Sequence, residues 1–275
     1  MSIKDIDTKK IVERQKKNHD EKMIDTIRSK TVIEKNTFSL NHTNDLSPRQ
    51  MKLAYLFLSQ LEPGSDDMTV TMDLKTVLRT LGLTTGGSNR AALKDQLATL
   101  RSKTFWINTR TPKGKSMESA VGLADRVDIV DESLCTIHFS NATREYIGNI
   151  EGGNFAKYEY EAMLALPDRK ERMNLLRLCV AEGYKGEFEV TLADLRMILG
   201  CEDGKYAEFK DFHKQILKPG VADINSFSGI SVSYKLNRLG RKCHSITFFV
   251  TGKTAEERFT SHMAAKAQIE GRLVV

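Results

Sequence analysis

Residues 205–218, KYAEFKDFHKQILK, carry the clearest structural pattern in the chain. Phe209, Phe212 and Ile216 recur at the spacing of one helix face, and we expect this face to pack against a core. A neighbouring stripe of the same helix is cationic and is spaced every four residues: Lys210, Lys214 and Lys218. The stretch therefore predicts a helix with one packed side and one side that carries ammonium groups.

The segments on either side of this helix predict a winged-helix domain, in which a strand and helices precede a β-hairpin called the wing. Residues 167–183 are strongly apolar and predict a first helix, with Asp168 at its N-cap and Glu171 at N3. Residues 188–190 alternate as in a strand, and residues 230–250 predict the hairpin. Three cations lie between the strands of this hairpin: Arg238, Arg241 and Lys242.

The same order of elements occurs about 120 residues earlier in the chain. A capping box with proline at N1 opens a helix over residues 47–61, and residues 68–72 alternate as a half-buried strand would. Residues 73–81 predict a short helix, and residues 88–101 predict a second helix with three leucines on one face. We expect residues 104–115, a strand followed by a basic loop, to belong to the wing of this unit.

Positive charge is concentrated on these helices and hairpins. The chain carries a net charge of +6, but residues 88–117 alone hold a local +6 and residues 224–255 a local +5. The rest of the chain is therefore negative. Concentrated cations favour a phosphate backbone as the ligand, because each cation that neutralises a phosphate releases a condensed counterion. A solvated lysine-rich surface is the alternative interpretation.

We predict that both units contact DNA through a helix and a hairpin. In the first unit the candidate residues are Ser88, Asn89, Arg90, Lys94, Arg101, Lys103, Lys113 and Lys115. In the second unit they are Lys205, Tyr206, Lys210, Lys214, Lys218, Arg238, Arg241 and Lys242. Donors on such a helix can pair with base edges in the major groove, whereas hairpin cations reach the backbone or the minor groove. For the helix lysines of the second unit, a solvated helix face is the alternative.

These patterns predict an α+β protein with two tandem winged-helix domains. We place the first domain at residues 36–140 and the second at residues 141–251. Residues 1–35 are rich in charge and only weakly periodic, so we expect a helical or partly disordered N-terminal arm. Residues 252–275 form a C-terminal tail. The content of 40% hydrophobic and 28% charged residues is that of an ordinary globular protein.

No enzyme or metal signature passes its spacing test. Residues 82–87 have the glycine spacing of a phosphate-binding loop but lack the Lys-Ser/Thr that must follow. The histidines include no His-x-His and no His-Glu-x-x-His, and the cysteines no Cys-x-x-Cys. We therefore predict no metal, no cofactor and no catalytic residue. The longest apolar run, residues 53–58, is too short to span a bilayer, and we expect a cytoplasmic protein without membrane contact.

The second unit closely resembles the second winged-helix domain of the plasmid-encoded Rep initiators, which bind repeated origin sequences called iterons. The resemblance rests on residues 209–219, on Asp223-Ile224-Asn225 and on Gly240-Arg241-Lys242. In the first unit, a looser resemblance begins at Leu46-Ser47. Together the two cover about residues 36–250.

The resemblance implies a plasmid replication initiator with several partners. It implies binding of double-stranded DNA at iterons as a monomer, and repression of its own promoter at an operator inverted repeat as a homodimer through the first domain. It also implies recruitment of the host initiator and the replicative helicase. A winged-helix transcriptional regulator without replication activity is the main alternative. A rolling-circle nicking enzyme is less favoured, because the histidine motif of its metal site is absent.

Overall fold

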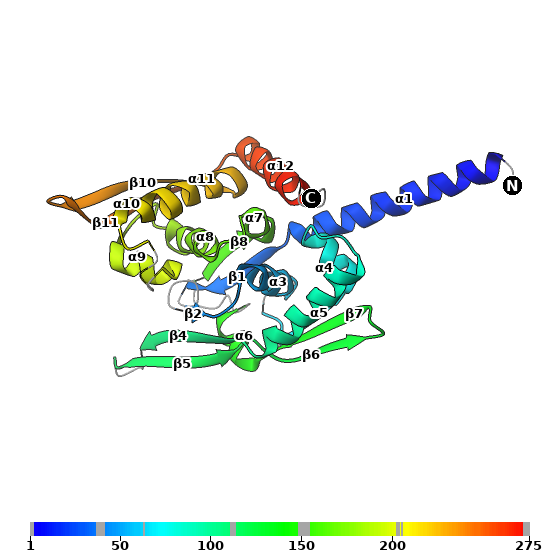
Figure 1. The fold of residues 1–275 in the computed structure, drawn as a ribbon, viewed down its shortest axis with the longest axis horizontal. Helices are drawn as coiled ribbons and strands as arrows, with labels where there is room; N and C mark the ends of the chain where they lie inside the picture. Colours follow the sequence, from blue (N-terminus) through cyan, green and yellow to red (C-terminus); the bar gives the residue numbers. More distant parts are fainter. Residues whose placement is uncertain are drawn as a thin grey trace.

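The protein is described by a computed structural model that covers residues 3–36, 42–62, 64–110, 114–147, 155–201, 204 and 206–271. Figure 1 shows an elongated molecule in which helix α1 (Ile3–Arg28) extends away from one side of the body. The strands in the described ranges form small antiparallel sheets, and helices pack between and over them.

The first winged helix opens with the predicted capping box. Ser47 Oγ accepts a hydrogen bond from the Gln50 backbone N–H at 3.3 Å, and Gln50 Oε1 accepts one from the Ser47 N–H at 2.9 Å. These bonds satisfy amides that the start of a helix leaves without partners, so the helix begins at Pro48 as predicted. Helix α3 (Pro48–Leu58) then ends at Leu58 rather than at Leu61.

A strand and two helices complete the helical part of this domain. β3 (Thr69–Asp73) leads into α4 (Leu74–Thr80), and Asp73 caps α4 by accepting a hydrogen bond from the Thr76 N–H at 3.0 Å. The turn after α4 requires a glycine, because Gly82 has a φ of +72° and a Cβ there would lie 2.8 Å from the Ile269 carbonyl oxygen. Helix α5 (Gly87–Arg101) follows and buries the three predicted leucines: Leu93, Leu97 and Leu100.

The second winged helix has its elements in the predicted order. They are α8 (Lys170–Gly183), β9 (Glu187–Thr191), α9 (Leu192–Leu199), α10 (Phe209–Phe212), the π-helical η1 (His213–Leu217), α11 (Lys218–Phe227), β10 (Ile230–Leu239) and β11 (Lys242–Gly252). α10, η1 and α11 follow one another without a break as one helix. β10 and β11 form the wing, and β11 pairs with β9. The wing thus shares a sheet with the strand that precedes the helices.

Two hairpins follow α5 in the first domain, and strand pairing shows which one is the wing. The first hairpin, β4 (Thr104–Arg110) and β5 (Ser116–Gly122), pairs with β2 (His42–Asn44) in a sheet of its own. In the second hairpin, β6 (Ala124–Val130) and β7 (Leu134–Phe139), β7 pairs with β3. By analogy with the second domain, β6–β7 is the wing. The interpretation of residues 104–115 as the wing was wrong. That prediction relied on the positive charge of the hairpin, whereas the wing is the hairpin that pairs with β3.

The N-cap residue of α8 differs from the prediction. The helix begins at Lys170, and its N-cap residue is Arg169, one position after Asp168. The predicted N-cap position was therefore wrong by one residue. The Asp168 carboxylate also accepts hydrogen bonds from two cations of α3, from Lys52 Nζ at 2.7 Å and from Arg49 Nε at 3.2 Å.

A strand lies inside the stretch that we expected to be an arm. β1 (Thr31–Lys35) pairs with β8 (Phe155–Glu159), and its Glu34 side chain is fully buried. Glu34 Oε1 accepts a hydrogen bond from Arg177 Nε of α8 at 2.8 Å, and Oε2 accepts one from the Tyr55 hydroxyl of α3 at 3.2 Å. Arg177 is only 1% exposed. A buried ion pair therefore joins β1 and α8, and Tyr55 connects it to α3.

Helices near both ends of the chain contact the body. Arg28, at the end of α1, donates hydrogen bonds from its guanidinium to the carbonyls of Thr80 and Arg79. Helix α12 (Ala255–Gly271) lies against α7 (Tyr160–Ala165), and Lys266 Nζ contacts Asp25 Oδ2 at 2.6 Å. The C-terminal tail is thus a packed helix over its described residues. Elsewhere in the chain, a short helix, α6 (Asn141–Tyr146), follows β7.

Replacing Arg177 by methionine should strongly destabilise the protein. The change leaves the Glu34 carboxylate buried without its cation, and breaking a buried ion pair in this way costs about 3–5 kcal/mol. We expect the free energy of unfolding, measured by urea titration with circular dichroism, to fall by about that amount. Arg241→Met is the matched control, since Arg241 is exposed and its loss should change stability by less than about 0.5 kcal/mol. Equal stability of the two variants would refute this role of Arg177.

Candidate nucleic-acid interface

The helix formed by α10, η1 and α11 has the predicted packed and cationic sides. Phe212 and Ile216 are fully buried. The three lysines are exposed: Lys210, Lys214 and Lys218. The helix differs from a regular α-helix at η1, where the Lys218 N–H bonds to the carbonyl of His213, five residues back. This wider turn shifts the lysines away from the regular spacing that the sequence predicts.

Two polar contacts connect this helix to the wing. His213 Nε2 and the Tyr234 hydroxyl share a hydrogen bond of 2.8 Å between η1 and β10. The Asn225 side chain accepts a hydrogen bond from the Val232 N–H at 2.7 Å and donates one to the Val232 carbonyl at 2.9 Å. Because Asn225 satisfies both backbone groups of a strand residue, the end of α11 and the start of the wing have one fixed arrangement.

The tip of this wing exposes the predicted cations. Gly240 adopts a φ of +60° in the turn, and Arg238 Nη1 donates a hydrogen bond to the Arg241 carbonyl at 3.2 Å. Arg238, Arg241 and Lys242 are all exposed. Among the described residues, no carboxylate lies within ion-pair distance of Arg241 or Lys242. Both charges are therefore available to a phosphate.

The approach to the helix differs from the prediction. The first helical residue is Phe209, and Lys205 lies outside the described residues. Tyr206 is half-buried with a φ of +60°, and its hydroxyl accepts a hydrogen bond from Arg169 Nη2 at 2.7 Å. Tyr206 therefore connects the loop before the helix to α8.

In the first domain the structure divides the predicted contacts of α5 into exposed and engaged residues. Ser88 and Arg101 are exposed. The Asn89 side-chain amide donates to the Thr84 carbonyl at 3.0 Å and thereby closes the turn before α5. Arg90 is half-buried, and its Nε is buried without a hydrogen-bond partner among the described residues.

The remaining predicted contacts of this domain lie after α5. Lys103 Nζ contacts Asp45 Oδ2 at 2.9 Å, so it is already paired. Lys115 is exposed in the loop just before β5. Lys113 lies outside the residues that the structure describes. Exposed charges of α5 and of the loop before β5 are therefore the candidates for contact in this domain.

The wing of the first domain is acidic at its tip. Asp131 and Glu132 occupy the β6–β7 turn with φ values of 46° and 52°, and both are exposed. Lys94 Nζ of α5 lies 3.2 Å from Glu132 Oε1. Carboxylates repel phosphate, so this wing cannot bind a DNA backbone as the basic wing can. In Figure 1 the β6–β7 tip lies at the opposite end of the molecule from the β10–β11 tip.

Sequence reasoning missed Glu132 and also Arg172, a buried arginine of α8 that contacts the helix of the second domain. For Arg172 the signal was Pro219, because a proline inside a helix leaves a carbonyl that needs another donor. For Glu132 no local signal existed, since only the fold brings the β6–β7 turn to α5.

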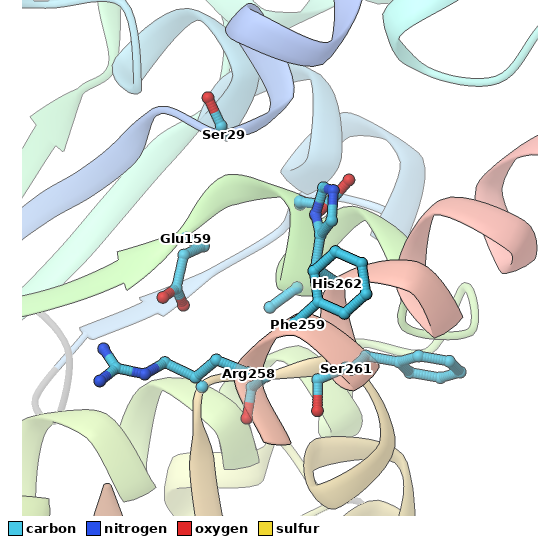
Figure 2. A pocket seen from close by; sticks show the side chains of 11 residues that line it. Ser29, Glu159, Arg258, Phe259, Ser261 and His262 are labelled. Atoms are coloured by element: carbon cyan, nitrogen blue, oxygen red, sulfur yellow. The ribbon is translucent and has the colours of Figure 1, made fainter. Parts of the chain in front are cut away.

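A cavity of about 300 Å³ lies away from these cations, beside α12. Figure 2 shows Glu159, Arg258 and His262 among the side chains around it. His262 Nδ1 is hydrogen-bonded to Glu161 Oε2, and burial raises the pKa of Glu161 while that bond opposes the rise. The predicted DNA contacts do not line this cavity.

Within the described residues, no group of three or more histidine, cysteine or acidic side chains has the arrangement of a metal site. None of the helices in those ranges is both long and apolar enough to cross a membrane. Burial raises the pKa of the Cys135 thiol to about 12 and that of Cys179 further, which keeps both thiols protonated.

Comparison with solved structures supports the fold. The chain is similar to the Pi initiator protein, solved in complex with iteron DNA, with 19% identity, a TM-score of 0.62, and coverage of 82% of this chain and 99% of that chain. It is also similar to domains 2 and 3 of RctB in two structures. Those matches have 10% and 12% identity, TM-scores of 0.45 and 0.43, and coverage of 80% and 78% of this chain and of 86% and 84% of theirs. Among curated protein sequences, none matches significantly.

Comparison with protein families assigns both halves of the chain. Residues 31–180 match the family model described as initiator replication protein, WH1, and residues 191–250 match that described as initiator Rep protein, WH2. The first match includes β1 and α8, while the boundaries that we placed at 36, 140 and 251 stay predictions. The predicted α+β fold with two winged-helix domains is confirmed. Since the two models together match well over half of the chain, the protein belongs to the family of initiator Rep proteins of plasmid replication.

Proposed function

We propose that this protein starts plasmid replication by binding the double-stranded iterons of its origin, with the second domain making the base-specific contacts. The observation that carries the proposal is the set of exposed cations on the helix and wing of the second domain. Three exposed lysines on one helix and three exposed cations at the tip of the adjoining wing belong to one winged helix. Such a helix enters the major groove, and such a wing reaches the backbone beside it.

The first domain contributes its contacts in a different way. Its wing is acidic, so we propose that α5 and the basic β4–β5 hairpin contact the adjacent turn of DNA instead. Arg101 and Lys115 are exposed on these elements. In Figure 1 the β4–β5 hairpin and the β10–β11 wing reach toward the same end of the molecule, which fits one duplex touching both.

We further propose that the protein acts in the cytoplasm without catalysis. Bending and crowding of bound copies would open the origin, with the deformation energy supplied by binding. Recruitment of the host initiator and the replicative helicase would follow. The family membership supports this role. A winged-helix regulator that only represses a promoter remains the second candidate.

Self-repression would use a homodimer formed through the first domain. Two features of β4 and β5 support this proposal. β5 is the edge strand of its sheet, with backbone groups open to another strand. Trp106, the one tryptophan of the chain, is 46% exposed on β4, and Met117 is 42% exposed on β5. Exposed apolar side chains on an edge strand and on the strand beside it favour association.

Replacing Arg241 by alanine should weaken origin binding and reduce its salt dependence. Each phosphate contact that is lost lowers the slope of log K against log salt by about one unit. We would measure the slope by fluorescence anisotropy on the duplex that the wild-type chain enriches from a random library. Lys157→Ala on β8, an exposed cation outside the proposed interface, is the control and should keep the wild-type slope. An unchanged slope for Arg241→Ala would refute phosphate contact there.

Replacing Trp106 by serine should shift the protein toward the monomer, because the dimer would lose an apolar side chain from its interface. Sedimentation velocity over a concentration series measures the dimer fraction. Phe259→Ser on α12 removes another exposed aromatic residue and should leave that fraction unchanged. A wild-type chain that stays monomeric at every concentration, or a dimer insensitive to Trp106→Ser, would contradict the proposed interface.

A plasmid whose only initiator gene encodes this chain should be maintained in its host. Because the basic wing of the second domain would hold the origin, the Arg241→Ala/Lys242→Ala variant should lose the plasmid within a few generations, and Lys157→Ala should keep it. Loss of the plasmid with the wild-type gene, together with tight binding to the selected duplex, would favour the regulator. Nicking of supercoiled DNA in the presence of magnesium would instead indicate an enzyme.

A further inference from the structure

The helix of the second domain contains a proline at an interior position. Pro219 is the second residue of α11, directly after the π-helical turn η1. Proline has no N–H, so the carbonyl of Gln215, four residues earlier, lacks its usual helical donor. The helix nevertheless continues to Phe227. A donor from outside the helix can take the place of the missing N–H.

Arginines of α8 supply the missing donors. Arg172 Nη2 donates a hydrogen bond to the Gln215 carbonyl at 3.0 Å, and Arg169 Nη1 lies 3.5 Å from the same oxygen. Arg172 is only 5% exposed. A bond of this kind is most effective when water cannot compete for the carbonyl.

The same guanidinium also contacts the far side of the proline. Arg172 Nη1 donates to Asp223 Oδ2 at 2.7 Å, while its Nη2 contacts Gln215. Gln215 lies four residues before Pro219, and Asp223 lies four residues after it. A planar group with donors in a fixed fork therefore spans the position where the helix lacks its own hydrogen bond.

Close packing holds α8 and α11 together at this point. A Cβ added to Gly220 would lie 2.7 Å from Leu175 Cδ2 and 3.5 Å from Arg172 Cδ. A larger residue at 220 would therefore displace the end of the Leu175 side chain, whereas its contact with Arg172 would be an ordinary one. Arg169, one turn earlier on the chain, also binds the Tyr206 hydroxyl in the loop before the helix.

We propose that Arg172 is a positioning residue for DNA recognition, which fixes the path of the helix across η1 and Pro219. The proposal rests on the function proposed above. Lys210 precedes the π turn and Lys218 follows it, so the path of the helix sets how the two ammonium groups lie relative to each other. Arg172 itself does not contact DNA, since it is buried under the helix. Its loss should impair the choice of sequence more than the attraction to phosphate.

The test compares Arg172→Lys with the wild-type chain on two duplexes of equal length. One is the duplex that the wild-type chain enriches from a random library, and the other is a scrambled version of it. Lysine keeps the charge beside Asp223 but lacks the planar fork whose two separate nitrogens reach Asp223 and the Gln215 carbonyl. We expect the ratio of the two affinities to fall about tenfold, with the salt slope and the scrambled-duplex affinity unchanged.

A rescue variant tests whether Arg172 acts by fixing the path of the helix or only through general stability. Pro219→Ala restores an N–H that can donate to the Gln215 carbonyl. In the Arg172→Lys background it should return the affinity ratio to within about threefold of the wild-type value, because an N–H of the helix itself then donates to that carbonyl. Lys218→Ala is the matched control, and it should weaken binding to both duplexes and lower the salt slope.

Two results would overturn the proposal: an affinity ratio that is unchanged in Arg172→Lys, as it would be after an equal loss on both duplexes, or no rescue by Pro219→Ala. Amide hydrogen exchange over residues 218–227 supplies a readout that needs no DNA. We expect faster exchange in Arg172→Lys and its reversal in the double variant. If the wild-type chain prefers no duplex, the proposed function fails. Unchanged hydrogen exchange in Arg172→Lys would separately refute the positioning role of Arg172.

Discussion

The buried ion pair between Glu34 and Arg177 is the constraint on which the rest of the arrangement depends. Two charges that lie out of water must stay paired, so the strand β1 cannot leave α8 without exposing one of them to an apolar interior. Tyr55 adds α3 of the first domain to the same contact. Five residues earlier on α8, Arg172 reaches the helix of the second domain. One helix thus connects the N-terminal strand, the first domain and the proposed DNA-reading helix.

The two domains share an order of elements but differ in charge. The wing of the second domain ends in exposed cations, whereas the wing of the first ends in Asp131 and Glu132. The basic hairpin of the first domain is an additional element, inserted between α5 and the wing and paired with β2. Two domains with the same topology therefore have different surfaces, and each would bind DNA through different elements.

Features that depend on neighbouring residues could be predicted from the sequence. The Ser47 capping box, the buried leucines of α5 and the exposed lysines of the second domain follow from local spacing. Features that depend on distant residues could not. Asp168 pairs with Lys52 of α3, β1 becomes a strand because β8 lies beside it, and the wing of the first domain is defined by pairing with β3. The contact of Arg172 with the Gln215 carbonyl, inside the π turn at residues 213–217, also joins residues that are distant in the sequence.

The position of Trp106 has a practical consequence. Since the chain has a single indole, and that indole is partly exposed on β4, the tryptophan fluorescence, excited at wavelengths where tyrosine does not absorb, originates from one known place. Its emission wavelength and quenching by iodide will report solvent access at that hairpin alone. The unlabelled protein therefore contains its own optical probe of the first domain, while the second domain contributes no tryptophan emission.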